Sequence, residues 1–168
     1  MILLLDERQR KELAQYSPYI AMLKVSSQNR RYIPMDYLEG EIIPGDKLFT
    51  MPSATSYEFG ILMSNVHMAW TRAVCGRLKS DYSYSNTIVY NNFPWPSPTK
   101  AILNARALYP DSNLADLYDP LTMPTELLKA HKANNRAVMH AYGFSIKMSE
   151  ADCVAELMRM YQKLTKEK

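Results

Sequence analysis

The chain is poor in glycine, and its few glycines are widely separated. Only five of its 168 residues are glycine, and neither a G-x-G motif nor the pattern G-x-x-x-x-G-K-[ST] occurs. Loops that hold phosphate groups need glycines at short spacing, because the backbone must approach the phosphate closely. The sequence therefore excludes the common glycine-rich nucleotide-binding motifs, and we expect no cofactor to bind to this chain.

Cysteines and long hydrophobic runs are also scarce. Cys75 and Cys153 form no C-x-x-C pair and have no histidine at ligand spacing, so neither a zinc site nor a disulfide framework is indicated. The apolar run Ile2–Leu5 is followed at once by the charged residues Asp6–Arg8, and it is too short for a signal peptide or a membrane span. We therefore expect a cytoplasmic protein that is not bound to a membrane.

Residue patterns of catalytic sites are missing too. The histidines His67, His131 and His140 occur singly, and the [DE]-x-K triplet of metal-dependent nucleases is absent. The segment Asp119–Thr122 resembles the D-P-P-[YF] element with which amino-methyltransferases hold a flipped base, but it lacks the second proline and the aromatic residue. A turn between two helices explains Tyr118–Pro120 better. We expect no catalytic residue and no metal ion in this chain.

The first half of the chain is predicted to mix strands and helix. Its composition is that of a folded protein, with 47% hydrophobic and 22% charged residues overall. Short apolar segments bounded by turn residues predict strands over Ile20–Val25, Arg31–Ile33, Glu41–Ile43 and Lys47–Met51. Apolar residues at helical spacing predict one long helix over Tyr57–Leu78, whose stripe of methionines and aromatics we interpret as core packing.

The second half is predicted to be helical throughout. Prolines recur between Phe93 and Pro98, where they remove amide donors and favour an extended connector, so we place a domain boundary there. Ser149 and Asp152 form a capping pair for the last helix. The predicted helices lie near 100–109, 112–118, 124–142 and 149–165. The predicted fold class is α+β, with a mixed domain of short strands and a long helix over 1–98 and an all-α helical domain over 99–168.

The net charge of +3 is too small to identify a nucleic-acid-binding protein, so the distribution of charge matters. Residues 24–35 and 59–80 carry basic but no acidic side chains. The first range contains Ser26–Tyr32, which combines hydroxyls, amides, two arginines and an aromatic ring, and Arg77–Asn86 has a similar mixture. Such side chains pair with base edges and phosphates. On composition alone, a solvated turn leading into a strand explains Ser26–Tyr32 equally well.

Several motifs of the chain are those of a known family. They are Ser26-Ser27-x-Asn29-Arg30-Arg31-Tyr32-Ile33-Pro34, Phe59-Gly60-Ile61-Leu62-x-Ser64, Cys75-Gly76-Arg77-Leu78-Lys79-Ser80-Asp81-Tyr82, Val89-Tyr90-Asn91-Asn92-Phe93-Pro94-Trp95-Pro96 and, in the helical half, Leu114–Pro120 and Ala141–Phe144. With these motifs the chain resembles the carboxy-terminal region of MmeI-like DNA methyltransferases, large single-chain restriction-modification enzymes of the type IIG/IIL kind. The resemblance spans roughly residues 20–165.

The resemblance implies a role for each half. Residues 1–98 would be part of a DNA target recognition domain, and residues 99–168 a helical carboxy-terminal domain. The family consists of adenine-specific DNA methyltransferases, often fused to an endonuclease, that use S-adenosylmethionine. The family's cofactor and catalytic motifs do not occur in these 168 residues. We therefore expect sequence-specific DNA recognition without catalysis by this chain alone, with S-adenosylmethionine bound by the rest of a full-length parent.

The resemblance also implies which residues contact DNA. Arg30 and Arg31 would read bases or anchor phosphates, and Arg77 and Lys79 would bind phosphates. Neighbouring polar and tyrosine side chains would contact the groove or the backbone. The complete expected set is Ser26, Ser27, Asn29, Arg30, Arg31, Tyr32, Arg72, Arg77, Lys79, Ser80, Tyr82, Tyr84, Ser85, Asn91 and Asn92.

Double-stranded DNA is the expected partner of the chain. A methyltransferase catalytic domain acting in trans and a second copy, forming a homo-oligomer through exposed apolar surface, are further candidates. Eleven methionines suit an adaptable surface of that kind. Two other interpretations stay open, namely a helical protein-interaction module that docks on a methyltransferase core and a non-functional remnant. Both would have negligible affinity for DNA.

Overall fold

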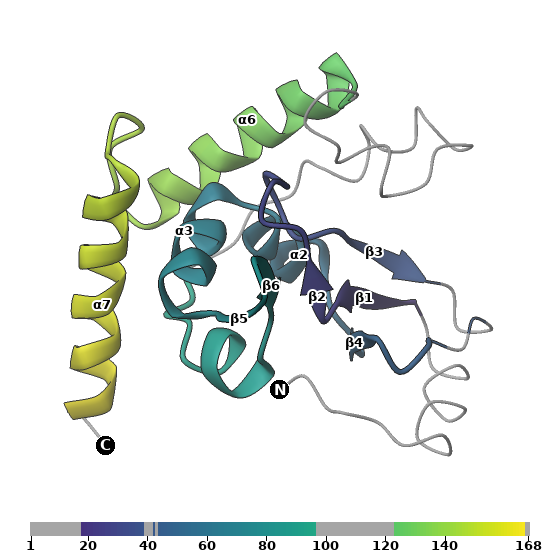
Figure 1. The fold of residues 1–168 in the computed structure, drawn as a ribbon. Helices are drawn as coiled ribbons and strands as arrows, with labels where there is room; N and C mark the ends of the chain where they lie inside the picture. The colour runs from purple at the N-terminus through teal and green to yellow at the C-terminus, as the bar shows by residue number, and fades with distance from the viewer. Residues whose placement is uncertain (1–17, 39–41, 43, 97–122, 167–168) are drawn as a thin grey trace.

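The computed structural model describes residues 18–38, 42, 44–96 and 123–166 (Figure 1). Two small antiparallel sheets and four α-helices make up this part of the chain, so the predicted α+β class is confirmed. The helices are α2 (Ser56–Leu62), α3 (Asn65–Val74), α6 (Thr125–Ala141) and α7 (Glu150–Lys166). The helices predicted near 100–109 and 112–118, the turn at 118–120 and most of the strand at 41–43 lie outside the described residues.

The first sheet is buried on both faces of its central strand. Its strand order is β3 (Met35–Leu38), β1 (Tyr19–Leu23), β4 (Leu48–Met51), with both pairings antiparallel. Ile20 and Met22 point into the main core, whereas Tyr19 and Ala21 form a small cluster on the opposite face. Apolar residues on both faces are expected of a strand that other elements cover on both sides.

The second sheet is formed by three very short strands. Its order is β2 (Val25–Ser26), β6 (Asp81–Ser83), β5 (Gly76–Leu78). The strand predicted over Ile20–Val25 is therefore split at Lys24, where the backbone changes partners. The N–H of Lys24 donates to the Lys47 carbonyl at 3.0 Å, and its carbonyl accepts from the Tyr84 N–H at 2.8 Å. Lys24 thus joins the two sheets.

The strand predicted over Arg31–Ile33 is wrong. Residues 31–34 form a bend and an irregular stretch that belongs to neither sheet, although Tyr32 and Ile33 are both buried. Pro34 follows them and has no N–H to offer a sheet. The backbone bends here instead, and β3 begins at Met35.

The long helix predicted over Tyr57–Leu78 is also wrong, because this segment contains two helices and a strand. The hydroxyl of Ser64 donates to the Ile61 carbonyl at 2.7 Å and accepts from the His67 N–H at 3.2 Å. This side chain ends α2 and caps α3, as serine does at helix starts. The apolar stripe continues across the break, so its spacing did not reveal it. Beyond α3 the chain turns into β5.

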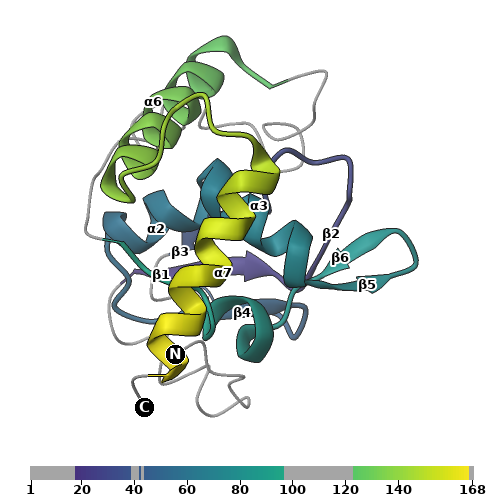
Figure 2. The ribbon, with the colours of Figure 1, turned by 90° about the vertical axis from the view of Figure 1, so that its left-hand side faces the viewer.

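The two long carboxy-terminal helices are confirmed. The predicted capping pair is present, since the hydroxyl of Ser149 donates to the Asp152 carboxylate at 2.6 Å and accepts from the Asp152 N–H at 3.1 Å. Both helices pack against α3, as Figures 1 and 2 show. The buried side chains Leu127, Val138 and Leu157 belong to the same cluster as those of the first half. The described residues of the two halves therefore share one hydrophobic core.

The break between α2 and α3 also holds α6 in place. Carbonyl groups at the end of a helix have no partner within it and must find one elsewhere. Asn134 of α6 donates to the Gly60 carbonyl at 2.7 Å, and Nδ1 of His131 donates to the Met63 carbonyl at 3.3 Å. Asn134 and His131 are buried. Polar side chains of the carboxy-terminal half thus satisfy backbone groups of the first half.

None of the described helices combines the length and the apolar character that a membrane span requires.

Candidate nucleic-acid interface

The structure brings together the two polar segments that the sequence singled out. Strand β2 pairs with β6, so that Ser26 lies opposite Tyr82 and Val25 opposite Ser83. The N–H of Gln28 also donates to the carboxylate of Asp81 at 3.3 Å. The segments Ser26–Tyr32 and Arg77–Asn86 are therefore neighbours in space, although 53 positions separate Gln28 from Asp81 in the chain.

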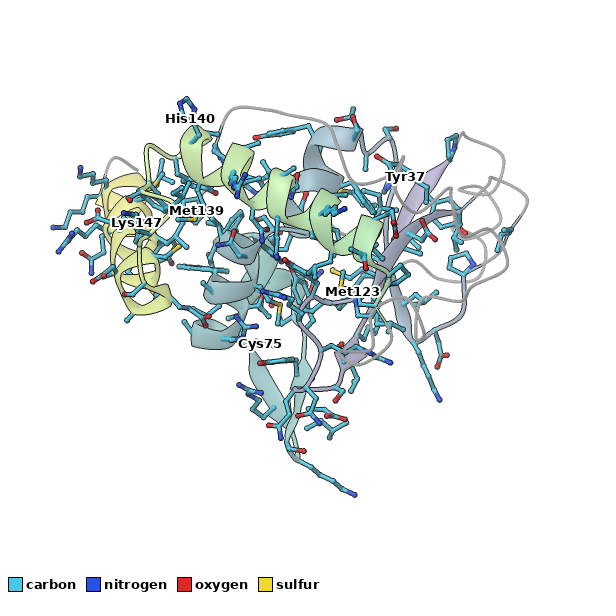
Figure 3. The ribbon with its side chains drawn as sticks, turned by 90° about the horizontal axis from the view of Figure 1, so that it is seen from above. Tyr37, Cys75, Met123, Met139, His140 and Lys147 are labelled. Atoms are coloured by element: carbon cyan, nitrogen blue, oxygen red, sulfur yellow. The ribbon has the colours of Figure 1, made fainter. Side chains whose placement is uncertain are left out.

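Strands β5 and β6 form a hairpin that projects from the body of the protein (Figures 2 and 3). Leu78 pairs with Asp81, which leaves a two-residue turn of Lys79 and Ser80. Residues 76–80 are all exposed. Lys79 has φ of +57°, a conformation that costs a residue with a side chain about 1–2 kcal/mol. The hairpin therefore carries a basic side chain at a turn position that favours glycine.

The hairpin is stiffened by Arg77. Its guanidinium lies 4.1 Å from the centre of the Tyr82 ring and donates to the Ser80 carbonyl at 3.2 Å. A cation over an aromatic face contributes about 0.5–1 kcal/mol at an exposed site. At the root of the hairpin, the Cys75 thiol donates to the Ser83 carbonyl at 3.0 Å. The two Arg77 contacts lie within the hairpin, and the Cys75 contact joins its base to the residue that ends α3.

The loop after β2 forms a turn beside the hairpin. The N–H of Arg30 donates to the Ser27 carbonyl at 3.2 Å, and the N–H of Asn29 donates to the Ser27 hydroxyl at 3.3 Å. Arg31 is exposed and Arg30 is half-buried. No carboxylate of the described residues forms an ion pair with Arg30, Arg31, Arg77 or Lys79. Their positive charge is therefore not neutralised by the described part of the protein.

Two of the expected DNA contacts are in the core, and we correct them. Tyr32 is 2% exposed, stacks on His131 with ring centres 4.2 Å apart, and accepts a hydrogen bond from Asn135. Tyr84 is 4% exposed, and its hydroxyl shares a hydrogen bond of 3.0 Å with Nε2 of His67. Burial raises the pKa of both tyrosines. Their side chains stabilise the fold and do not reach the surface.

Ser26 and Tyr82 are corrected for the same reason. Both side chains lie on the inner face of the second sheet and are nearly fully buried. The Ser26 hydroxyl has no hydrogen-bond partner among the described residues. Tyr82 lies beneath the guanidinium of Arg77. These two residues pack between the second sheet and the interior of the protein.

Other expected contacts already have structural partners. The Ser85 hydroxyl accepts from the Ile88 N–H and thereby caps the short π-helix η1 (Asn86–Tyr90). Asn92 donates to the carbonyls of Thr87 and Ile88 in the same helix. Arg72 pairs with Glu150 of α7 at 2.9 Å. The other side chains of the expected set that are exposed or half-buried are Ser27, Asn29, Arg30, Arg31, Arg77, Lys79, Ser80 and Asn91. Of these, Ser27 and Arg77 have the partners described above.

The expected set left out two residues at or near this surface, Lys24 and Asp81. Lys24 lies in the acid-free range 24–35, beside this surface, and its ammonium group donates to the Asp46 carbonyl and lies 5.2 Å from the centre of the Phe49 ring. Asp81 ties the hairpin to Gln28, which only the pairing of β2 with β6 reveals. The surface is therefore not uniformly basic, since one carboxylate lies beside the turn.

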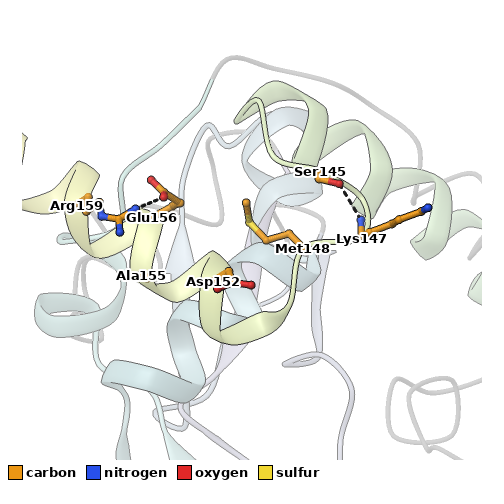
Figure 4. Close-up of a pocket in the computed structure, with 7 residues that line it drawn as sticks. All are labelled: Ser145, Lys147, Met148, Asp152, Ala155, Glu156 and Arg159. Atoms are coloured by element: carbon orange, nitrogen blue, oxygen red, sulfur yellow. Dashed lines mark hydrogen bonds and ion pairs between the residues drawn. The ribbon is translucent and has the colours of Figure 1, made fainter.

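Charged side chains line a hollow in the second half of the chain. A hollow of about 550 Å³ lies beside α7, lined by Ser145, Lys147, Met148, Asp152, Ala155, Glu156 and Arg159 (Figure 4). Its carboxylates are engaged, because Asp152 binds Ser149 and Glu156 pairs with Arg159. Among the described residues, no three His, Cys, Asp or Glu side chains come together as the ligands of a metal ion would.

Comparison with known proteins identifies the family. Residues 5–97 match the model of the MmeI target recognition domain, and residues 97–167 match that of the MmeI C-terminal domain. The chain belongs to the MmeI family. The family resemblance predicted from the sequence is therefore confirmed. The hairpin lies in the part that matches the MmeI recognition domain, and α6 and α7 lie in the part that matches its C-terminal domain.

Two known proteins are similar to most of this chain. A solved structure of the type IIL restriction-modification enzyme MmeI, in complex with DNA, is 42% identical with a TM-score of 0.83, and the match covers 89% of this chain and 22% of that one. DNA methyltransferase A of Bacillus subtilis (strain 168) is 38% identical over 168 residues, covering 94% of this chain and 19% of that protein. The chain thus spans about a fifth of each relative.

Proposed function

We propose that this chain forms the DNA-recognition part of an adenine-specific DNA methyltransferase of a restriction-modification system. The observation that carries the proposal is the pairing of β2 with β6, which places two basic segments side by side on a projecting hairpin and the adjacent turn. A two-stranded β-ribbon fits the major groove of DNA. The MmeI structure was determined in complex with DNA, which supports the same partner for this chain.

The exposed side chains divide naturally by type. Arg30, Arg31, Arg77 and Lys79 supply positive charge for phosphates or guanine edges, while Ser27 and Asn29 supply hydroxyl and amide groups. Lys79 keeps a strained backbone at the turn, which supports a role for its charge rather than for its conformation. Contacts to phosphates would set the orientation of the hairpin on the duplex.

Methyl transfer itself would require residues beyond these 168. We propose that this chain binds no S-adenosylmethionine and transfers no methyl group alone, and that a catalytic part, on the same polypeptide or in trans, supplies both functions. The test incubates the purified chain with DNA and labelled S-adenosylmethionine. Incorporation of label into DNA by this chain alone would contradict the proposal.

DNA binding is tested by measuring the affinity of the chain for duplex DNA as salt is raised. If the four basic side chains contact phosphates, the logarithm of the binding constant should fall with the logarithm of salt concentration with a slope of up to about −4. Replacing Lys79 by alanine should reduce the size of that slope by about 1. Lys163→Ala, which removes an exposed lysine of α7, is the matched control and should leave the slope unchanged.

Alanine variants of Arg30 and Arg31 distinguish base readout from phosphate binding. An arginine that reads guanine should, on replacement by alanine, weaken binding by about 1–3 kcal/mol and relax specificity at one position. One that holds a phosphate should weaken binding to all sequences alike. Binding that does not depend on salt would instead favour a protein-docking module.

A further inference from the structure

The hairpin has two faces of different chemistry, which the strand register defines. In antiparallel strands, residues directly opposite each other place their side chains on the same face. Arg77 lies opposite Tyr82, and Tyr82 lies opposite Ser26, so these three residues share the inner face. Leu78 lies opposite Asp81, and these two residues share the outer face.

The outer face carries apolar side chains that the described residues do not cover. Leu78 is 57% exposed and Val25 is 39% exposed, whereas Tyr82 on the inner face is 4% exposed. Gly76, in the same strand as Leu78, adds no side chain to this face. Single exposed apolar side chains are common on protein surfaces, but Leu78 stands on a projecting hairpin beside two basic side chains, so a partner that binds this hairpin would meet it.

The surroundings of Leu78 restrict what that partner can be. Leu78 stands between Arg77 and Lys79, whose charges complement DNA. The carboxylate of Asp81, directly opposite Leu78, would be repelled by a phosphate. This face therefore suits base edges in the groove better than the sugar-phosphate backbone.

The position of Leu78 in the hairpin also decides the kind of contact. An apolar side chain that is inserted between base pairs must stand at the tip of the element that enters the DNA. Here the leading residues of the turn are Lys79 and Ser80, both polar, and Leu78 lies one position behind them on the flank. Leu78 is placed to touch the edge of a base rather than to enter the stack. In the major groove, the apolar group on the base edges of unmodified DNA is the C5-methyl group of thymine.

We propose that Leu78 is a specificity-determining residue that contacts the methyl group of a thymine in the major groove. The proposal rests on the DNA-recognition function proposed above and names one base feature that the hairpin reads. It extends the list of contacts from charged and polar residues to an apolar one.

The test is a binding selection with the full 168-residue chain from a pool of randomised duplex DNA. Two pools are used, one made with thymine and one with uracil, which pairs identically but lacks the methyl group. The wild-type chain should select thymine at one position of the first pool and lose about fourfold in affinity when that thymine is replaced by uracil, the value of one buried methyl group. In Leu78→Ala, the preference at that position should disappear while the other positions stay selected.

Leu164→Ala is the matched control, because Leu164 is a leucine of similar exposure, 53%, near the end of α7. It should select the same sequence as the wild type. A Leu78→Ala chain that keeps the thymine preference, or a wild-type chain that binds both pools equally, would overturn the role of Leu78 while leaving DNA recognition intact. A wild-type chain that selects no sequence from either pool would overturn the proposed function and, with it, this inference.

Discussion

The buried histidine of α3, His67, should make the stability of the protein depend on pH. His67 is 1% exposed, shares a hydrogen bond with the Tyr84 hydroxyl, and packs edge-on against the Phe93 ring, with ring centres 4.9 Å apart. Burial lowers the pKa of His67 from its ordinary 6.5 to about 3, because a charged ring would lose its hydration. The folded protein therefore keeps this ring neutral.

The sign and size of the effect follow from these pKa values. Above pH 6.5 the ring is neutral in both the folded and the unfolded chain, and its contribution to stability is fully present. As the pH falls below 6.5, the His67 ring becomes protonated in the unfolded chain, whereas in the folded chain it stays neutral until the pH is about 3. Each pH unit in this window costs about 1.4 kcal/mol, so the loss reaches about 3 kcal/mol at pH 4.5.

The variant His67→Gln isolates this contribution. Glutamine cannot be protonated in this range and can still form a hydrogen bond with Tyr84, but it loses the ring packing against Phe93. We expect the variant to be about 1–3 kcal/mol less stable than the wild type at pH 7.5. At pH 4.5 the difference should vanish or reverse, because only the wild type loses the histidine contribution.

Urea unfolding followed by tryptophan fluorescence measures both proteins at each pH, since the ring of Trp70 is buried and donates to the Val89 carbonyl at 2.9 Å. Carboxylates titrate in both proteins, so their effect cancels in the difference. His140→Gln is the control, because His140 is exposed on α6, and its difference from the wild type should change by less than about 1 kcal/mol. A wild-type-minus-H67Q difference that stays constant from pH 7.5 to 4.5 would refute the reasoning.

Two further predictions concern residues that support the hairpin or join the two halves. Asn134→Ala removes the buried hydrogen bond to the Gly60 carbonyl and leaves that carbonyl without a partner. Urea unfolding should therefore show that the free energy of unfolding falls by about 2–3 kcal/mol. Asn29→Ala in the exposed loop is the control and should change the free energy of unfolding by less than about 1 kcal/mol. Ser26→Ala removes a buried hydroxyl that has no partner among the described residues, so stability should stay equal or rise by up to about 1 kcal/mol, with the salt dependence of DNA binding unchanged. A clear loss of DNA affinity in this variant would restore Ser26 to the set of contacts.

Elements that are determined by residues close together in the chain could be predicted from the sequence. Helix α7 was predicted almost residue for residue, because its apolar spacing and the Ser149–Asp152 capping pair lie within one segment. The long helix over Tyr57–Leu78 was wrong because a single hydroxyl, that of Ser64, outweighs a continuous apolar stripe. β5 was missed because its three residues form a strand only through pairing with β6.

The candidate site shows the same division. Arg31 and Lys79 are exposed, as predicted for charged side chains, and their contact with DNA stays a prediction. Tyr32 and Tyr84 were placed at the surface because their hydroxyls suggested contacts, but both hydroxyls find partners inside the protein. A tyrosine can be buried whenever its hydroxyl has such a partner, and the sequence does not show that partner.

The sequence by itself determined the family, the fold class and the scarcity of glycine that excludes a glycine-rich nucleotide site, because motifs and composition can be read without knowing which residues meet. Tertiary structure alone decided that two basic segments form one surface, that Leu78 faces outward from it, and that Asn134 and His131 join the two halves through freed carbonyls. The physical reason is that pairing of β2 with β6 and burial of polar groups depend on contacts between residues far apart in the chain.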